Sequence, residues 1–342
     1  MVKKNERRKN NLRYSLLLLL LLLVFLMVST YAWFTANQTV TISTLDVNVQ
    51  TSNGLQISAD AINWKTILQK ADITGASATY TSSVNQVPDE MQPVSSAGIV
   101  DTDTGYMDMY FGTVDALDDG TGYSLASDKE VDTRGAEGRY IAFDIFLRVD
   151  QTTPVYLTTA SNIITKEGAA DKGLQNAARV AFIDEGNIAD VGDSTGAQAL
   201  KGGTTSIIWE PNYDVHTAAG VANAKEIYGL DTTTTGATQL SYQGIKAEFA
   251  DTEGVTLKNT NTFSQYFQTV TPTISTVKDF DTQQTLLNLK AGITKVRIYM
   301  WVEGQDVDCE NNASGTDISF NVQITKATRS EERRVGKECR SR

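Results

Sequence analysis

Three segments of the chain alternate between hydrophobic and polar residues at every second position. They are residues 140–149, 294–302 and 319–325. A period of two is that of a β-strand with one face toward a core and the other toward water. We therefore predict three half-buried antiparallel strands, and we expect the last two to pair as a wide hairpin.

Shorter apolar runs separated by Gly, Asn and Asp predict further strands. These cover residues 39–50, 55–58, 107–111, 155–159, 178–183, 206–209 and 285–289. Short helices are expected at 61–70 and 223–227. Between the strand candidates, the long polar stretches within 71–138 and 165–265 indicate loop insertions at the surface or short elements that the pattern does not reveal. Many short strands with turns between them predict an all-β fold, an antiparallel, jelly-roll-like β-sandwich.

The alternation in residues 39–50 changes phase near Ser43 and Thr44. The apolar residues on either side of this point are Val40, Ile42, Leu45, Val47 and Val49. A slip of one residue reverses the faces of a strand, so a bulge or bend is expected there. Two interpretations remain open: a bulged edge strand of the same sandwich, or a donor strand that pairs with a neighbouring subunit.

The first residues of the chain have the pattern of an export signal. A basic start is followed by the apolar run 16–28, and Thr30 and Ala32 occupy the small-residue positions before a cut at Trp33. An uncleaved anchor is the alternative, because residues 14–37 carry no charge. Either interpretation places the following residues outside the cytoplasm. We expect a signal peptide or anchor at 1–32 and a secreted domain at 33–328.

Residues 329–342 resemble the in-frame translation of a sequencing adapter, and we treat them as an artefactual tail. The chain has a net charge of −11; residues 1–32 contribute +5 and the tail +3, so the region between them carries −19. A domain this acidic repels nucleic acid and anionic membranes. Contact with a membrane is therefore expected only through the N-terminal segment. Outside the tail Cys309 is the single cysteine, so no disulfide framework is expected.

The segment from Thr30 to Val49 resembles the TasA/camelysin class of exported Gram-positive proteins. It has a leader ending in Thr-aromatic-Ala, an aromatic residue, a polar spacer and a Leu-Asp-Val strand. The resemblance implies removal of the leader by a signal peptidase, a jelly-roll-like sandwich and, for some members, assembly into matrix fibres. The long insertions of this chain depart from the compact members.

Candidate chemistry in the sequence is sparse. The one histidine, His216, and Cys309 form no recognisable catalytic pattern, and no Cys/His cluster predicts a zinc site. Acidic loops offer possible oxygen ligands for calcium, although none has the full spacing of a calcium loop. The candidate metal residues are Asp101, Asp103, Asp108, Asp306 and Asp308. Apart from possible calcium, no cofactor is expected.

These observations favour a non-enzymatic structural or adhesive protein of the cell envelope or biofilm matrix. Self-association through the N-terminal strand is the expected mechanism, with other envelope or matrix proteins as further partners. The expected location is extracellular or at the surface of a Gram-positive-type cell. A monomeric glycan- or calcium-binding module is the alternative, and a hydrolase using a carboxylate pair ranks third.

Overall fold

The computed structural model describes residues 39–50, 54–116, 123–213, 215–222, 243–245, 267–275, 284–309 and 315–326. The predicted leader with Thr30, Ala32 and Trp33, the helix expected at 223–227 and the tail at 329–342 lie outside these ranges. Within them, no helix has the length and apolar character needed to cross a membrane.

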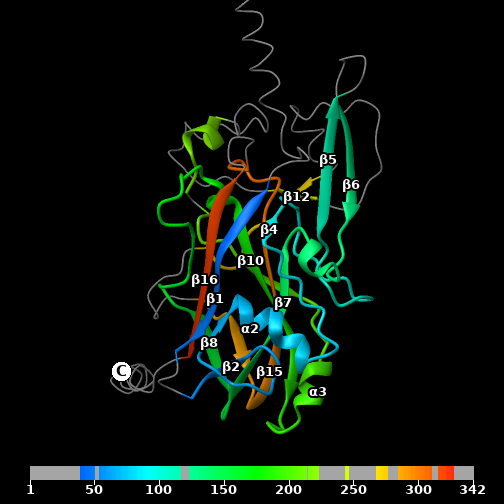
Figure 1. The fold of residues 1–342 in the computed structure, drawn as a ribbon, viewed down its shortest axis with the longest axis vertical. Coiled ribbons are helices and arrows are strands. Elements are labelled where there is room, and N and C mark those ends of the chain that lie inside the picture. The colour runs from blue at the N-terminus through cyan, green and yellow to red at the C-terminus, as the bar shows by residue number, and fades with distance from the viewer. Residues whose placement is uncertain are drawn as a thin grey trace, which may run out of the picture.

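The fold is mostly β, with two large sheets (Figure 1). Side chains from both sheets pack together in one main hydrophobic core. The seven-stranded sheet has the order β14-β8-β16-β1-β3, with β4 paired to β1 and β9 to β16. Its strands are β1 (Val40–Val49), β3 (Ile67–Gln69), β4 (Glu90–Met91), β8 (Thr153–Leu157), β9 (Asn162–Thr165), β14 (Leu287–Leu289) and β16 (Thr316–Lys326).

The five-stranded sheet has the order β11-β10-β15-β7-β2 and is antiparallel throughout. Its strands are β2 (Gln56–Ser58), β7 (Ile141–Val149), β10 (Ala178–Ile188), β11 (Ser206–Trp209) and β15 (Gly292–Val302). Two further antiparallel pairs are β5 (Tyr110–Ala116) with β6 (Tyr123–Lys129) and β12 (Gln243–Ile245) with β13 (Phe267–Thr269).

The three strongest strand predictions are confirmed as β7, β15 and β16, but the expected hairpin is wrong. β15 pairs with β10 and β7, whereas β16 lies in the other sheet between β1 and the strands β8 and β9. The long connection after β15 therefore crosses from one sheet to the other. β1 and β16 also pair in parallel, a departure from the expected antiparallel sandwich.

The bulge expected in the first strand is confirmed, because the register of β1 against β16 shifts between Ile42 and Thr44. The shift lets the apolar residues on both sides of it face the core, and all five are buried. The expected edge position is wrong. β16 pairs with one side of β1, and β3 and β4 pair with the other.

The outer face of the five-stranded sheet is covered by protein. The segment between β3 and β7, expected as surface insertions, contributes buried residues such as Val94, Met107 and Met109 to a second cluster with Tyr299 and Trp301. As a result every residue of β15 is buried, including its polar positions. The prediction that β15 is half-exposed is therefore wrong.

Helices are few and short in the described residues. Residues 61–70 contain β3 and only the start of a helix, because α2 spans Lys70–Gly75 and α3 spans Ser194–Ala199. Three short 3-10 turns also lie in these ranges: η2 (Ala76–Ala78), η3 (Gly135–Glu137) and η4 (Leu174–Ala177).

Candidate functional site

Two groups of buried charged side chains are centred on β15 and on the loop that follows it. Each group also includes side chains from other segments of the chain. The first, the Arg297 cluster, fills the outer face of the five-stranded sheet. It consists of Tyr80, Asp132, Tyr140, Asp144, Lys295, Arg297 and Tyr299. Polar side chains reach this layer because alternate residues of β7 and β15 point away from the main core.

Arg297 joins two aspartates in this layer. Its Nη1 donates to Asp144 at 2.9 Å, and its Nε and Nη2 donate to Asp132 at 3.0 and 2.8 Å. The hydroxyl of Tyr140 also donates to Asp132. All three charged side chains are at most 2% exposed. A buried pair of this kind requires satisfied hydrogen bonds, and the cluster supplies them.

Lys295 lies beside Asp144 in the same cluster. Its Nζ is 3.2 Å from Asp144 Oδ2 and donates to the Tyr80 hydroxyl at 2.9 Å. Tyr80 in turn donates to Asp144 at 2.8 Å. Burial alone would raise the pKa of Asp144, but Arg297 and Lys295 outweigh burial and hold that pKa below its ordinary value.

The second group, the Arg179 cluster, lies where the loops after β11 and β15 meet β10. It consists of Arg179, Glu210, His216, Glu303, Asp306 and Asp308. Arg179 Nη2 contacts Asp306 and lies 2.9 Å from Glu210. Glu303 accepts from Trp301 Nε1 and from two backbone amides, each at 3.1 Å.

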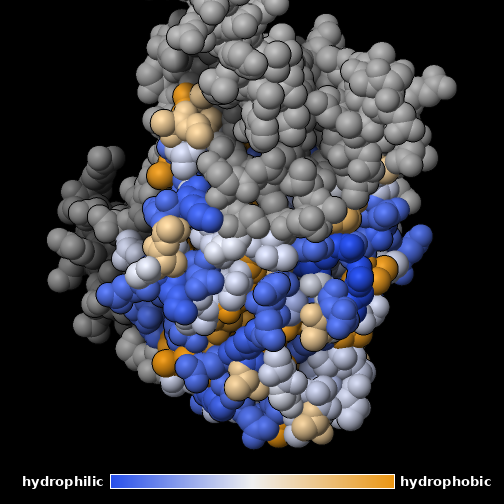
Figure 2. Space-filling model, turned by 45° about the horizontal axis from the view of Figure 1, so that its top comes forward, coloured by the Kyte–Doolittle hydropathy of each residue, from blue (hydrophilic) through white to orange (hydrophobic). Residues whose placement is uncertain are grey.

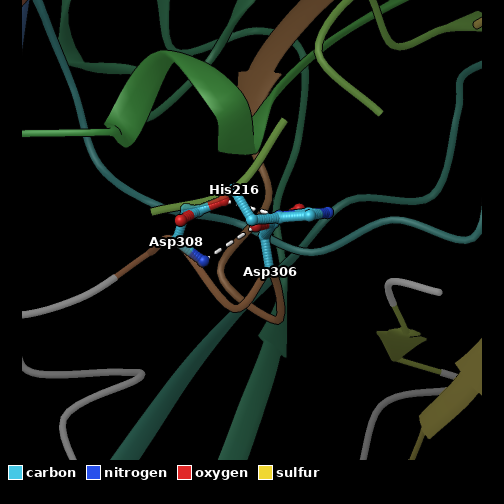
Figure 3. A group of neighbouring side chains, drawn as sticks. All are labelled: His216, Asp306 and Asp308. Atoms are coloured by element: carbon cyan, nitrogen blue, oxygen red, sulfur yellow. Dashed lines mark hydrogen bonds and ion pairs between the residues drawn. The ribbon is translucent and has the colours of Figure 1, made fainter. Parts of the chain in front are cut away.

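Asp308 fastens the loop that contains His216 to the end of β15. One of its oxygens lies 2.7 Å from His216 Nδ1, and the other accepts from the Thr217 amide and hydroxyl at 2.9 and 2.8 Å. Figure 3 shows His216, Asp306 and Asp308 grouped at this junction. A Cβ on Gly220 would lie 2.4 Å from Asp308, so the close approach of the loop depends on that glycine.

Acidic groups outnumber basic ones in the Arg179 cluster. Four carboxylates face Arg179 and His216, and burial raises the pKa of Glu303 to about 7 and raises that of Glu210 as well. Burial alone would lower the pKa of His216, but Asp308 and the other acids raise it. Among the described residues, Glu210 Oε2 and His216 Nε2 have no hydrogen-bond partner. This cluster therefore favours bound protons.

The structure separates the five candidate metal residues into two places. Asp101 and Asp108 lie 2.9 and 2.6 Å from Lys129 Nζ, with Asp103 exposed beside them. Asp306 and Asp308 are buried with His216, and ligand atoms of these three lie within 4.8 Å of one another. Their carboxylate oxygens already accept from Arg179, His216, Thr217 and the Asp308 amide. Calcium binding stays a prediction.

Cys309 is buried next to this cluster in sequence and in space. Burial and the neighbouring acids raise the pKa of its thiol, which keeps it protonated. A protonated thiol is a weak nucleophile. The contact of His216 with Asp308 joins its loop to the residues that follow β15.

The buried clusters around Arg179, Glu210, Lys295 and Arg297 were not predicted from the sequence. For Lys295 and Arg297, however, the sequence contains a pattern that could have indicated such a cluster. Lys295 and Arg297 lie on the polar face of the predicted strand 294–302, and Asp144 lies on the polar face of the predicted strand 140–149. Opposite charges on two adjacent strands favour cross-strand pairing. Arg179 and Glu210 carried no comparable pattern.

Comparison with known proteins gave no match to a protein-family model, a curated protein or a solved structure.

Proposed function

We propose that this protein is a non-enzymatic structural protein of the extracellular matrix or cell surface, with a jelly-roll-like sandwich that assembles by exchange of β1. The observation that carries the proposal is the position of β1. It is the first described strand, and it supplies five buried apolar residues to a sheet whose other members come much later in the chain or are very short.

The partners of β1 allow it to leave without unthreading the fold. On one side it pairs in parallel with β16, through nine residue pairs. On the other side it pairs only with the three-residue β3 and the two-residue β4. A copy of β1 from a second molecule makes the same backbone and side-chain contacts. Exchange in one direction then builds a filament, and reciprocal exchange builds a closed dimer.

The face of the described residues that Figure 2 shows is consistent with assembly through a strand rather than through a broad apolar patch on that face. Hydrophilic residues cover much of the described surface in Figure 2, and hydrophobic residues lie singly or in small groups. Scattered apolar residues are normal on a soluble surface, whereas a large patch marks an interface. Main-chain pairing at β1 thus provides the specific contact in this proposal.

A disulfide that locks β1 in its own sheet tests the mechanism. Thr41 and Glu90 are paired residues of β1 and β4, and neither is buried. Paired antiparallel residues have Cα separations of roughly 4.5–5.5 Å, which suits a disulfide. The test protein is residues 33–328 with Thr41→Cys and Glu90→Cys, beside the unchanged chain and a Thr41→Ser, Glu90→Ser control.

Light scattering and negative-stain microscopy then follow assembly against protein concentration. We expect oligomers or filaments from the unchanged chain and the serine control. The oxidised cysteine variant is expected to stay monomeric until a reductant is added. Monomers from every version, or equal assembly of the oxidised variant, would rule out exchange of β1.

A further inference from the structure

Three strands of the five-stranded sheet bring a lysine, an aspartate and a glutamate together in the protein interior. Lys295 lies on β15, Asp144 on the neighbouring β7 and Glu185 on the neighbouring β10. Lys295 and Asp144 side chains are 8% and 2% exposed, and Glu185 as a residue is 2% exposed. Glu185 lies at the bulge of β10 and interacts electrostatically with both of the others.

The amine and the carboxyl group already lie in contact. Lys295 Nζ is 3.2 Å from Asp144 Oδ2. The Tyr80 hydroxyl bridges them, since it accepts from Nζ at 2.9 Å and donates to Oδ2 at 2.8 Å. Arg297 donates to the other oxygen, Oδ1, at 2.9 Å. Fixed proximity of this kind replaces a collision between two free groups.

We propose that Lys295 and Asp144 condense into an intramolecular isopeptide bond between β15 and β7. A proton passes from Nζ to Oδ2, so that the ion pair becomes a neutral amine and a carboxylic acid. Nζ then attacks the carboxyl carbon of Asp144 and forms the C–N bond. The C–Oδ2 bond breaks, and Oδ2 leaves as water with a second proton from the nitrogen. No oxidant or cofactor is consumed.

The neighbours of the pair have the positions that this reaction requires. Tyr80 links the donor nitrogen to the leaving oxygen and provides a path for both protons. Arg297 faces Oδ1, where negative charge develops when the amine attacks. Glu185 is a buried acid whose pKa is raised by burial, and it lies on the opposite side of Lys295 from β7. We assign it a supporting role in proton transfer.

The charges that remain after condensation are still balanced. The reaction removes one positive and one negative group, and Arg297 keeps its bonds from Nε and Nη2 to Asp132. The new bond thus leaves Arg297 and Asp132 paired with each other, and an unpaired charge in their place would be costly. The bond ties two strands of the sheet covalently in a chain whose described cysteine, Cys309, is in no disulfide.

Mass spectrometry of the purified chain tests the bond directly. The linked protein is expected to be lighter than its sequence mass by one water, about 18 Da. Tryptic digestion is expected to give residues 140–148 joined to 291–297, because trypsin does not cut after an amidated lysine. An unshifted mass, with separate peptides and cleavage after Lys295, would overturn the proposal.

Variants assign the roles within the cluster. Lys295→Arg keeps the charge but cannot form the bond, and its mass is expected to match its sequence. Tyr80→Phe and Glu185→Gln are expected to reduce the linked fraction, with Lys129→Arg as a surface control that stays fully linked. If Lys295→Arg does not fold, the peptide map of the unchanged chain still decides. The test is independent of β1 exchange, which involves the other sheet.

Discussion

One cation contacts two carboxylates at three places in the described part of the chain, and the surroundings differ. Lys129 bridges Asp101 and Asp108 at the surface, where its side chain is 36% exposed. Arg297 bridges Asp132 and Asp144 in the interior, and Arg179 bridges Glu210 and Asp306 there. Water screens the exposed arrangement at Lys129, whereas loss of the cation at either of the other two would leave carboxylates buried without a counter-charge.

The two buried clusters also differ from each other. The Arg297 cluster contains equal numbers of acids and bases, because Lys295 accompanies Arg297. The Arg179 cluster has more carboxylates than cations among the described residues. Arg297 and Lys295 hold the pKa of Asp144 low in the first cluster, whereas burial raises the pKa of Glu210 and Glu303 in the second. The first is therefore expected to respond most to loss of its cation, and the second to pH.

The largest effect is expected for Arg297→Met. The change leaves Asp132 buried with the charge of its partner removed, and it also removes the donor to Asp144. Breaking a buried pair by deleting one member costs roughly 3–5 kcal/mol. Urea unfolding followed by fluorescence measures the change. A loss below about 1 kcal/mol would show that this cluster behaves like a surface pair.

A smaller, pH-dependent effect is expected from the Arg179 cluster. The folded pKa of Glu303 is about 7 and that of Glu210 is also raised above the unfolded value near 4.5. Between the unfolded and the folded pKa values, the folded state therefore binds more protons than the unfolded state. As a result, stability falls as pH rises from about 4.5 through 7. The raised pKa of His216 acts in the same direction.

The slope is expected to reach about 1.4 kcal/mol per pH unit for each group that is protonated only in the folded state. Glu210→Gln mimics the protonated acid and keeps an oxygen for Arg179. We therefore expect the stability of this variant to change less with pH. The urea midpoints of each protein from pH 4.5 to 8 measure this pH dependence. Glu90→Gln, a change at an exposed residue of β4, is the control. Equal slopes in all three proteins would contradict the assignment.

The sequence predicted the β-rich class, the main strands and the bulge in β1 because each depends on local alternation. It did not predict how the sheets are covered. Lys295 and Arg297 alternate with apolar residues as solvent-facing residues do, yet residues from far along the chain bury them. The same layer buries Tyr299 and Trp301, which lie on this face of β15 with them.

The candidate sites illustrate the same limit in physical terms. The acidic loops at Asp101 and Asp306 look alike in sequence, since each has aspartates two residues apart. One lies at the surface beside a lysine, and the other is buried against Arg179 and a histidine 92 residues away from Asp308. Burial and partners from distant segments decide their chemistry, and neither is encoded in the local spacing.

The smallest effect is expected at Lys129, which sharpens the comparison with Arg297. Lys129→Met removes a cation from two aspartates, as Arg297→Met does, but these two side chains are 22% and 18% exposed and keep contact with water. Exposed pairs contribute about 0–1 kcal/mol, and added salt weakens them further. The urea midpoint is therefore expected to move little, and the remaining difference is expected to shrink in high salt. A loss as large as that of Arg297→Met would mean that this loop is a structural element of the fold, and that exposure does not separate the two arrangements.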